Sequence, residues 1–283
     1  MIKIQTTVIM ILSIILIGVY HVNSSLSTDV LKVSFLDIGQ GDSILIEAPN
    51  GVQLLVDAGP DGEVVRQLGK VMKFYDHSID LMLETHEDSD HISGFVDVLD
   101  RYEVGEKLVY GTSTKDTETV EVLENSLLEN DVPIRQVAQG DKIILDSKNN
   151  IYVEVISPFK GQKGSPNDLS VVLKVVYAET ELLLTGDISE TIERGLIASY
   201  GNQLESDVLK IGHHGSRTST SDEFLKVVNP KYAVIQVGKE NKYGHPDPDV
   251  LERIKGKNIE ILRNDEEGTV VLTSDGKEFS RLK

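Results

Sequence analysis

The sequence contains no cysteine among its 283 residues. This absence excludes disulfide bonds, thiolate zinc sites and cysteine nucleophiles together. Histidine and carboxylate side chains are therefore the only plausible ligands for a metal ion. An exported protein of this composition would need no oxidising compartment in which to fold.

Positive charge is scarce as well. The chain has 28 Lys and Arg against 46 Asp and Glu, which gives a net charge of −18. The mean field of such a surface repels anions, including nucleic acid. A phosphate-bearing substrate would need local help, for which a bound divalent metal is suited. The composition disfavours a DNA-binding function without excluding it.

No linker rich in Gly, Ser or Pro divides the chain. With 283 residues and 40% apolar content, the sequence can bury one substantial core. We therefore expect one globular unit over residues 29–283, preceded by a separate hydrophobic segment.

Residues 1–28 have the features of a targeting segment. Lys3 supplies a positive charge, and residues 7–20 are almost wholly apolar. The apolar run is short for a membrane span of roughly 20 residues. Because no alanine-x-alanine site is present, both cleavage near residues 23–25 and retention as an anchor remain open. Either outcome predicts a protein on the extracellular face of the membrane or secreted from the cell.

The pattern of apolar residues predicts a mixed α/β (α+β) protein. In the first half we expect strands over residues 31–37, 43–47, 52–57, 79–83 and 107–111 and around 134 and 143, with helices over 63–74, 92–101 and 117–129. In the second half we expect strands over 152–156, 169–177, 181–184, 208–211, 233–237 and 259–262, alternating with helices and with a hairpin at 178–180. Two such sets predict a four-layer αββα sandwich with its site at the strand ends.

The densest group of ligand-type side chains follows the apolar strand at residues 79–83. His86, Asp88, Asp90 and His91 lie within six positions, in a turn that leads into a helix. Side chains of such a loop can converge on one point, and imidazole with carboxylate suits zinc, manganese or iron. The alternative is a solvated acidic turn with two incidental histidines.

Three further motifs follow other strands: Asp57-Ala58-Gly59, Thr185-Gly186-Asp187, and the run Gly212-His213-His214-Gly215-Ser216. Together with residues 86–91 they resemble the motifs of the metallo-β-lactamase superfamily, whose H-x-H-x-D-H sequence here has Asp88 in place of the second histidine. With residues 35–43 and 241–246, the pattern is similar, over residues 31–283, to the extracellular metallo-β-lactamase domain of ComEC competence proteins.

This resemblance implies a site for one or two divalent metal ions, zinc or manganese. The implied ligands are His86 and Asp88 for one metal, Asp90, His91 and either His213 or His214 for the other, and Asp187 as a bridge. The family's usual histidine before the bridging aspartate is missing, and residues 167–170 are its nearest counterpart. The loss of histidines shifts the preference from zinc toward manganese or magnesium.

The resemblance also assigns Asp90 a catalytic role, holding the attacking hydroxide as well as a metal; its alternative is a helix cap. His245 could donate a proton to the leaving oxygen or bind an anionic group, or it could be an incidental loop residue. Asn241, Ser216 and Arg217 are candidates for substrate binding because they lie near the histidines in sequence, with ordinary loop roles as the alternative.

The predicted function is that of a metal-dependent hydrolase, most directly a phosphodiesterase or nuclease of the ComEC type acting outside the membrane, with DNA as one candidate substrate. Another ester, such as a lactone or a phosphorylcholine ester, is the first alternative. A β-lactam fits the motif less well. A metal-binding module without activity is the alternative from another class.

Overall fold

The computed structural model describes residues 30–111 and 117–282. The predicted signal peptide or membrane anchor at residues 1–28 lies outside the described residues. Within the described part, no helix has the length and apolar composition that a membrane crossing requires.

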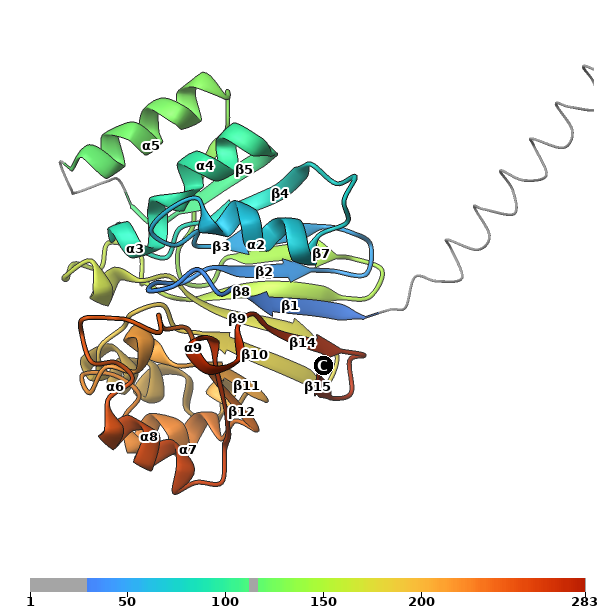
Figure 1. Ribbon diagram of the computed structural model, residues 1–283. Coiled ribbons are helices and arrows are strands. Elements are labelled where there is room, and N and C mark those ends of the chain that lie inside the picture. The colour runs from blue at the N-terminus through green and yellow to red at the C-terminus, as the bar shows by residue number, and fades with distance from the viewer. Residues whose placement is uncertain (1–29, 112–116, 283) are drawn as a thin grey trace, which may run out of the picture.

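The first sheet contains eight strands (Figure 1). In spatial order these are β15 (Phe279–Arg281), β14 (Val270–Ser274), β1 (Leu31–Phe35), β2 (Ile44–Glu47), β3 (Gln53–Val56), β4 (Ser78–Leu83), β5 (Glu103–Val109) and β6 (Ile134–Gln136). Strands β3 to β6 are parallel to one another, and the other pairs are antiparallel. The sheet is therefore mixed.

The second sheet contains seven strands. In spatial order these are β13 (Glu260–Arg263), β12 (Tyr232–Ile235), β11 (Val208–Lys210), β10 (Thr180–Leu184), β9 (Val172–Tyr177), β8 (Ile151–Ser157) and β7 (Lys142–Asp146). Strands β10 to β13 are parallel, and β7 to β10 are antiparallel. The predicted hairpin at residues 178–180 is present as the β9–β10 turn.

Helices cover the outer face of each sheet, because each parallel connection crosses over through a helix. The first sheet carries α2 (Glu63–Val71), α3 (Ser89–Ile92), α4 (Gly94–Arg101) and α5 (Glu118–Glu129), and the second carries α6 (Glu190–Tyr200), α7 (Asp222–Val228) and α8 (Pro248–Lys255). Figure 1 shows the helices above and below the two stacked sheets. The remaining short helices are η1 (Asn167–Leu169), η2 (Gly201–Leu204), η3 (Gly212–Gly215) and α9 (Asn264–Glu267). The predicted four-layer αββα architecture is confirmed.

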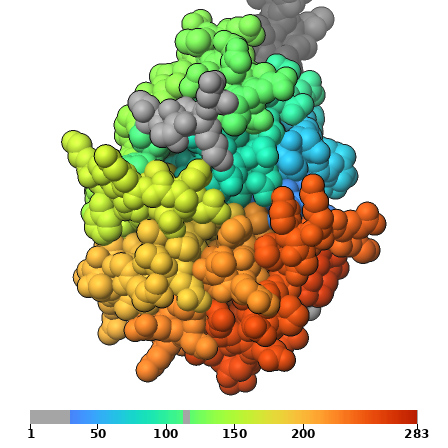
Figure 2. Space-filling model, turned by 90° about the vertical axis from the view of Figure 1, so that its left-hand side faces the viewer, coloured from blue at the N-terminus to red at the C-terminus, as the bar shows by residue number. Residues whose placement is uncertain are grey.

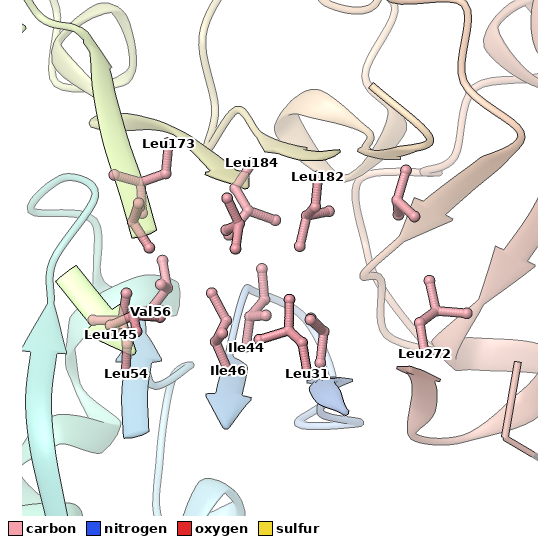
Figure 3. Close-up of a cluster of buried hydrophobic side chains, with 14 of the residues drawn as sticks. Leu31, Ile44, Ile46, Leu54, Val56, Leu145, Leu173, Leu182, Leu184 and Leu272 are labelled. Atoms are coloured by element: carbon pink, nitrogen blue, oxygen red, sulfur yellow. The ribbon is translucent and has the colours of Figure 1, made fainter. Parts of the chain in front are cut away.

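Alternate side chains of the central strands fill the space between the sheets (Figure 3). On β2, Ile44 and Ile46 face the other sheet, while Leu45 packs among the residues beneath the outer helices. On β10, Leu182 and Leu183 divide in the same way. Successive side chains of a strand point to opposite faces, and both faces are covered here, so Ile44–Ile46 and Leu182–Leu184 are continuous apolar runs.

One predicted helix ends early. The apolar pattern indicated a helix over residues 63–74, but α2 ends at Val71 and Met72 is extended. Phe74 and Tyr75 prolonged the pattern, yet they are 90% and 65% exposed. These side chains pack against no core, so their apolar character does not indicate the buried face of a helix.

Two further boundaries differ near the motifs. The helix predicted over residues 92–101 is divided into α3 and α4, so the helical turn begins at Ser89, inside the histidine and aspartate motif. The strand predicted over residues 169–177 begins only at Val172, because the preceding residues form η1.

The last strands of the chain were not predicted. Strand β14 pairs with β1, with Leu31 opposite Ser274, and β15 forms the sheet edge. The strand predicted around residue 143 also joins the second sheet, not the first. The pairing of β1 with β14 is long-range, which local patterns of apolar residues do not encode, whereas β7 joins the second sheet through its chain neighbour β8.

Candidate metal centre

Carboxyl ends of parallel strands from both sheets meet at one edge of the sandwich. Asp57 follows β3, His86 follows β4, Asp187 follows β10 and His214 follows β11. This edge lies beside α3, on the left of Figure 1, and faces the viewer in Figure 2. In open α/β sheets, such strand ends are the usual place for ligands.

His91 lies in the first turn of α3 and is completely buried. Its Nδ1 is 2.8 Å from Asp57 Oδ2, and its Nε2 is 3.4 Å from Asp187 Oδ2. Burial alone would lower the pKa of His91, but the carboxylates of Asp187 and Asp57 raise it well above its usual value. The two carboxylates therefore favour positive charge at the His91 ring.

Asp57 acts as an anchor for the segment that follows β4. Its Oδ1 accepts a hydrogen bond from the Thr85 backbone N–H at 2.8 Å, and its Oδ2 accepts one from Thr85 Oγ1 at 2.7 Å. Since the Thr85 hydroxyl proton goes to Asp57, its oxygen is free to accept from His86 Nδ1, 3.0 Å away. The early Asp-Ala-Gly motif thus orients His86 and His91 together.

His214 lies in the buried centre of the cluster. Its Nδ1 donates to the Gln236 carbonyl at 3.0 Å. Its Nε2 lies 3.5 Å from Asp90 Oδ2 and 3.4 Å from Asp187 Oδ2. Burial lowers its pKa, but Asp187 and the other neighbouring carboxylates outweigh that effect and raise it to about 9.

His213 lies at the rim. Its side chain is 34% exposed, against 2% for His214, and its Nε2 is 3.9 Å from Asp187 Oδ2. Both histidines have positive φ, 49° and 52°. This conformation is uncommon for residues other than glycine and is found at functional sites. Here it turns two adjacent side chains in different directions.

Asp187 links the histidines that come from the two sheets. It is 3% exposed, and its backbone N–H donates to Ser170 Oγ at 3.1 Å. Its pKa is well below the usual value, because His214, His91 and a nearby lysine outweigh the opposing effect of burial. Gly186, at φ +51°, precedes it, and a Cβ there would lie 2.8 Å from Ser170 Cβ.

Asp90 lies at the more open side of the cluster, with its side chain 30% exposed. Burial would raise its pKa, but His214, with Nε2 3.5 Å from Asp90 Oδ2, and the charge of His91 lower it. Its backbone approaches the first loop so closely that a Cβ on Gly41 would lie 1.9 Å from Asp90 O. Asp88 is 32% exposed, with Oδ2 3.7 Å from His86 Nε2.

The three buried imidazoles share one arrangement of hydrogen bonds. In each, Nδ1 faces an acceptor: Thr85 Oγ1 for His86, Asp57 for His91 and the Gln236 carbonyl for His214. In the neutral ring, the proton is then on Nδ1 and the lone pair on Nε2.

Each of these Nε2 atoms, and Asp187 Oδ1, is buried without a hydrogen-bond partner among the described residues. Buried polar atoms are rarely left unpaired, and metal-bound histidines usually have the other ring nitrogen held in this way.

Ligand atoms of the cluster are close enough to share a cation. Two sets contain only predicted ligands and have their ligand atoms within 4.8 Å of one another: His86, His91 and Asp187, and Asp90, His91 and His214. Two further sets include Asp42: one with Asp57 and His91, the other with Asp187 and His214. The residues present therefore fit a divalent metal. Ser170 Oγ lies 3.4 Å from His86 Nδ1, so the segment that stands for the missing histidine offers a hydroxyl instead.

Two of the predicted substrate-binding residues, Asn241 and Ser216, make contacts within their own loops, whereas Arg217 contacts the residue that caps α8. Asn241 Nδ2 donates to the carbonyls of Gly238 and His245. Ser216 Oγ is 3.0 Å from Thr218 Oγ1. Arg217 pairs with Asp247 at 2.9 Å and is 71% exposed.

The ring of His245 lies beside the exposed histidine at the rim of the site. The centroid of His245 is 5.9 Å from that of His213 and 5.9 Å from that of Tyr243, on which it stacks. Burial and the positive charges of His213 and His214 lower the pKa of His245. A neutral imidazole is therefore favoured at the rim.

The sequence motifs predict no role for Gln236, Lys210 or Asp42, and they include Ser170 only within residues 167–170, the counterpart of the missing histidine. Lys210 could have been noticed as a charged residue in the otherwise apolar run 208–211. Gln236 gives no such signal, because it contributes a backbone carbonyl to His214, and Ser170 lies near His86 only when the two sheets are brought together.

A cleft of about 670 Å³ opens next to His86. Its apolar part is formed by Val109, Val137, Ala138, Pro166 and Leu169, and Lys160 and Lys163 also line it. Of the carboxylates beside it, Glu84 is paired with Lys107 at 2.6 Å. The cleft can accommodate a substrate larger than the group bound at the cluster.

The four-layer fold and the cluster of histidines and aspartates at its strand ends indicate the superfamily to which the protein belongs. The model of the metallo-β-lactamase superfamily matches residues 36–239, and the chain belongs to this superfamily. Among curated proteins, it is similar to ComE operon protein 3 of Bacillus subtilis, with 32% identity over 256 residues, which cover 84% of this chain and 32% of that protein. It is also similar to competence protein ComA of Neisseria gonorrhoeae, with 31% identity over 244 residues, covering 84% of this chain and 31% of that protein. The chain spans about a third of each relative.

Solved structures share the fold at low sequence identity. CmlA, a diiron β-hydroxylase from Streptomyces venezuelae, gives a TM-score of 0.55 at 16% identity, covering 89% of this chain and 54% of that one. A long form of RNase Z from yeast gives a TM-score of 0.54 at 12% identity, covering 86% and 42%. The predicted family, and its resemblance to competence proteins, are confirmed.

Proposed function

We propose that this chain is a metal-dependent hydrolase that cleaves phosphodiesters, with single-stranded DNA as its leading candidate substrate. The observation that carries the proposal is the set of three buried imidazoles whose Nε2 atoms converge on Asp187 and have no hydrogen-bond partner in the part of the chain that the structure describes. Similarity to competence proteins supports a nucleic-acid substrate.

The proposed ligands are the residues around the cluster centre. His91, His214 and Asp90 would hold one ion, His86 and Asp88 would contribute to a second, and Asp187 would serve both. Bound zinc or manganese would supply an acidified water and a Lewis acid for the developing charge. We propose His214, not His213, as the histidine ligand, because its Nε2 is buried within 3.5 Å of two carboxylates.

The chain's own residues would position the reacting groups. Asp90, at the open side of the cluster, would orient the attacking water with its carboxylate. The neutral imidazole favoured at His245 would donate a hydrogen bond from its ring N–H to the leaving oxygen, and the proton that this oxygen takes up would come from the attacking water. The cleft beside His86 would hold the body of the substrate.

The location of this activity follows from the N-terminal segment. If residues 1–28 are a signal peptide or an anchor, the catalytic domain is outside the membrane. There, an acidic surface would repel bulk nucleic acid, so cleavage would depend on the metal and the cleft.

The test is hydrolysis of bis(p-nitrophenyl) phosphate and single-stranded DNA by the full chain in mild detergent, with manganese or zinc. The Asp90→Ala variant is compared with the wild type, and the Asp88→Ala variant tests the carboxylate that lies 3.7 Å from His86 Nε2. Metal-dependent cleavage that is lost in Asp90→Ala supports the proposal. Inactivity of the metal-loaded wild type toward both substrates would refute it and favour another ester.

A further inference from the structure

Lys210 is a fully buried lysine next to the candidate metal centre. It is the last residue of β11, has 0% exposure, and forms an ion pair with Asp42. Its Nζ is also 3.8 Å from Asp187 Oδ1 and 3.5 Å from the Gly186 carbonyl. The ammonium group therefore lies beside Asp187, the aspartate that links the histidines of the two sheets.

Asp42 extends this contact to a second member of the cluster. It lies in the loop between β1 and β2 and is 2% exposed. While Oδ2 pairs with Lys210, Oδ1 is 3.3 Å from His214 Nδ1. Because Asp42 comes from the first sheet and Lys210 from the second, the pair also bridges the sandwich at the site.

Stability does not account for such a pair. Removing two charges from water costs several kcal/mol per ion, and apolar residues of similar volume often fold equally well or better in their place. The pair does, however, place charge beside two members of the cluster: Lys210 Nζ is 3.8 Å from Asp187 Oδ1 and Asp42 Oδ1 is 3.3 Å from His214 Nδ1, which are ion-pair contacts and not hydrogen bonds. Contacts of this kind fix the direction in which a ligand presents its other atom.

We propose that Lys210 and Asp42 are positioning residues of the metal centre. Lys210 attracts the Asp187 carboxylate, and the charge of Asp42 reinforces the orientation of the His214 ring, whose Nδ1 donates to the Gln236 carbonyl, so that both ligands face the cluster before a metal arrives. The inference rests on the metal centre of the proposed function, and it assigns a role to two residues outside the ligand set. Partners of this kind typically contribute 10- to 100-fold to metal affinity.

The test replaces the pair by apolar residues of similar size, Lys210→Met with Asp42→Leu, in the full chain. The matched control is Lys174→Met with Glu181→Leu, which removes another buried-lysine ion pair of 2.8 Å from the same sheet. Affinity for Mn²⁺ and Zn²⁺ is measured by competition with a chelator, and thermal unfolding is recorded without metal. We expect the first variant to bind about 10- to 100-fold more weakly while unfolding as the wild type does, and the control to keep its affinity.

Wild-type affinity in the Lys210 and Asp42 variant would overturn the inference, and so would an equal loss in the control, which would indicate general loosening. If the double variant does not fold, Asp42→Asn alone must still lower the affinity. Hydrolysis is recorded separately: a wild type that binds metal but cleaves neither phosphodiester refutes the proposed function and leaves this inference standing. A wild type that binds no metal refutes both.

Discussion

Replacing the two adjacent histidines one at a time gives a direct test of the candidate metal centre. His213→Ala and His214→Ala remove the same side chain from neighbouring positions, and both leave the local sequence otherwise unchanged. Of these two histidines, His214 is the one whose Nε2 lies within 3.5 Å of both Asp90 and Asp187. The two variants should therefore differ greatly.

The expected difference can be worked out from these contacts. Loss of an outer partner of a metal ligand typically costs 10- to 100-fold in affinity. Loss of His214, a proposed ligand itself, should cost about 100-fold or more, which is about 3 kcal/mol. His213 has a 34% exposed side chain and lies 3.9 Å from Asp187, so its removal should change the affinity by less than about threefold.

The assay is metal affinity of each variant, measured by chelator competition, with the metal content after dialysis as an independent check. Circular dichroism confirms that each variant is folded. If His213→Ala loses metal and His214→Ala keeps it, the assignment from burial is wrong. If neither changes, the cluster does not hold the metal through this pair.

Two other predictions concern charge. Without metal, protonated His214 stabilises the fold, because its pKa is raised from 6.5 to about 9. This stabilisation of about 3 kcal/mol is fully present below pH 6.5 and is lost as the pH rises through about 9. The stripped protein should therefore melt at progressively lower temperature over that interval, and the metal-loaded protein should not. A melting temperature of the stripped protein that rises with pH would contradict this. Lys160→Gln with Lys163→Gln should raise KM for single-stranded DNA about 2- to 30-fold and reduce the slope of log affinity against log salt by about 1.4, without affecting bis(p-nitrophenyl) phosphate. The control Lys148→Gln with Lys277→Gln, on loops away from the cleft, should leave both unchanged. An equal effect in the control would show that the two cleft lysines have no specific part in binding DNA.

The four layers and most of the strands could be predicted from the sequence because burial on both faces leaves a strong apolar pattern. The site motifs were visible for a related reason: each follows an apolar strand, so the chain itself marks where the strand ends are. What the sequence could not distinguish was His213 from His214, since adjacent positions differ only through their backbone angles and the direction of each side chain.

The supporting residues were harder to find than the candidate ligands. Lys210 and Asp42 are far apart in sequence and meet only when one sheet packs on the other. Gln236 contributes a backbone carbonyl to His214, and any residue has a carbonyl, so no side chain marks this role. Ser170 lies in the segment that corresponds to the missing histidine, but its contacts with His86 and Asp187 form only in the folded protein.

The pairing of β14 with β1 has a consequence for how the protein is made. The second edge of β1 is paired only after residues 270–274 have been synthesised, whereas its other neighbour, β2, follows it directly in the chain. During synthesis, β1 would present an open edge while the remaining domain emerges, and unpaired edges are the sites at which chains associate wrongly. Contacts of such long range also slow folding. A chain truncated before residue 270 would retain every proposed metal ligand, yet it would lack the strand that closes this edge.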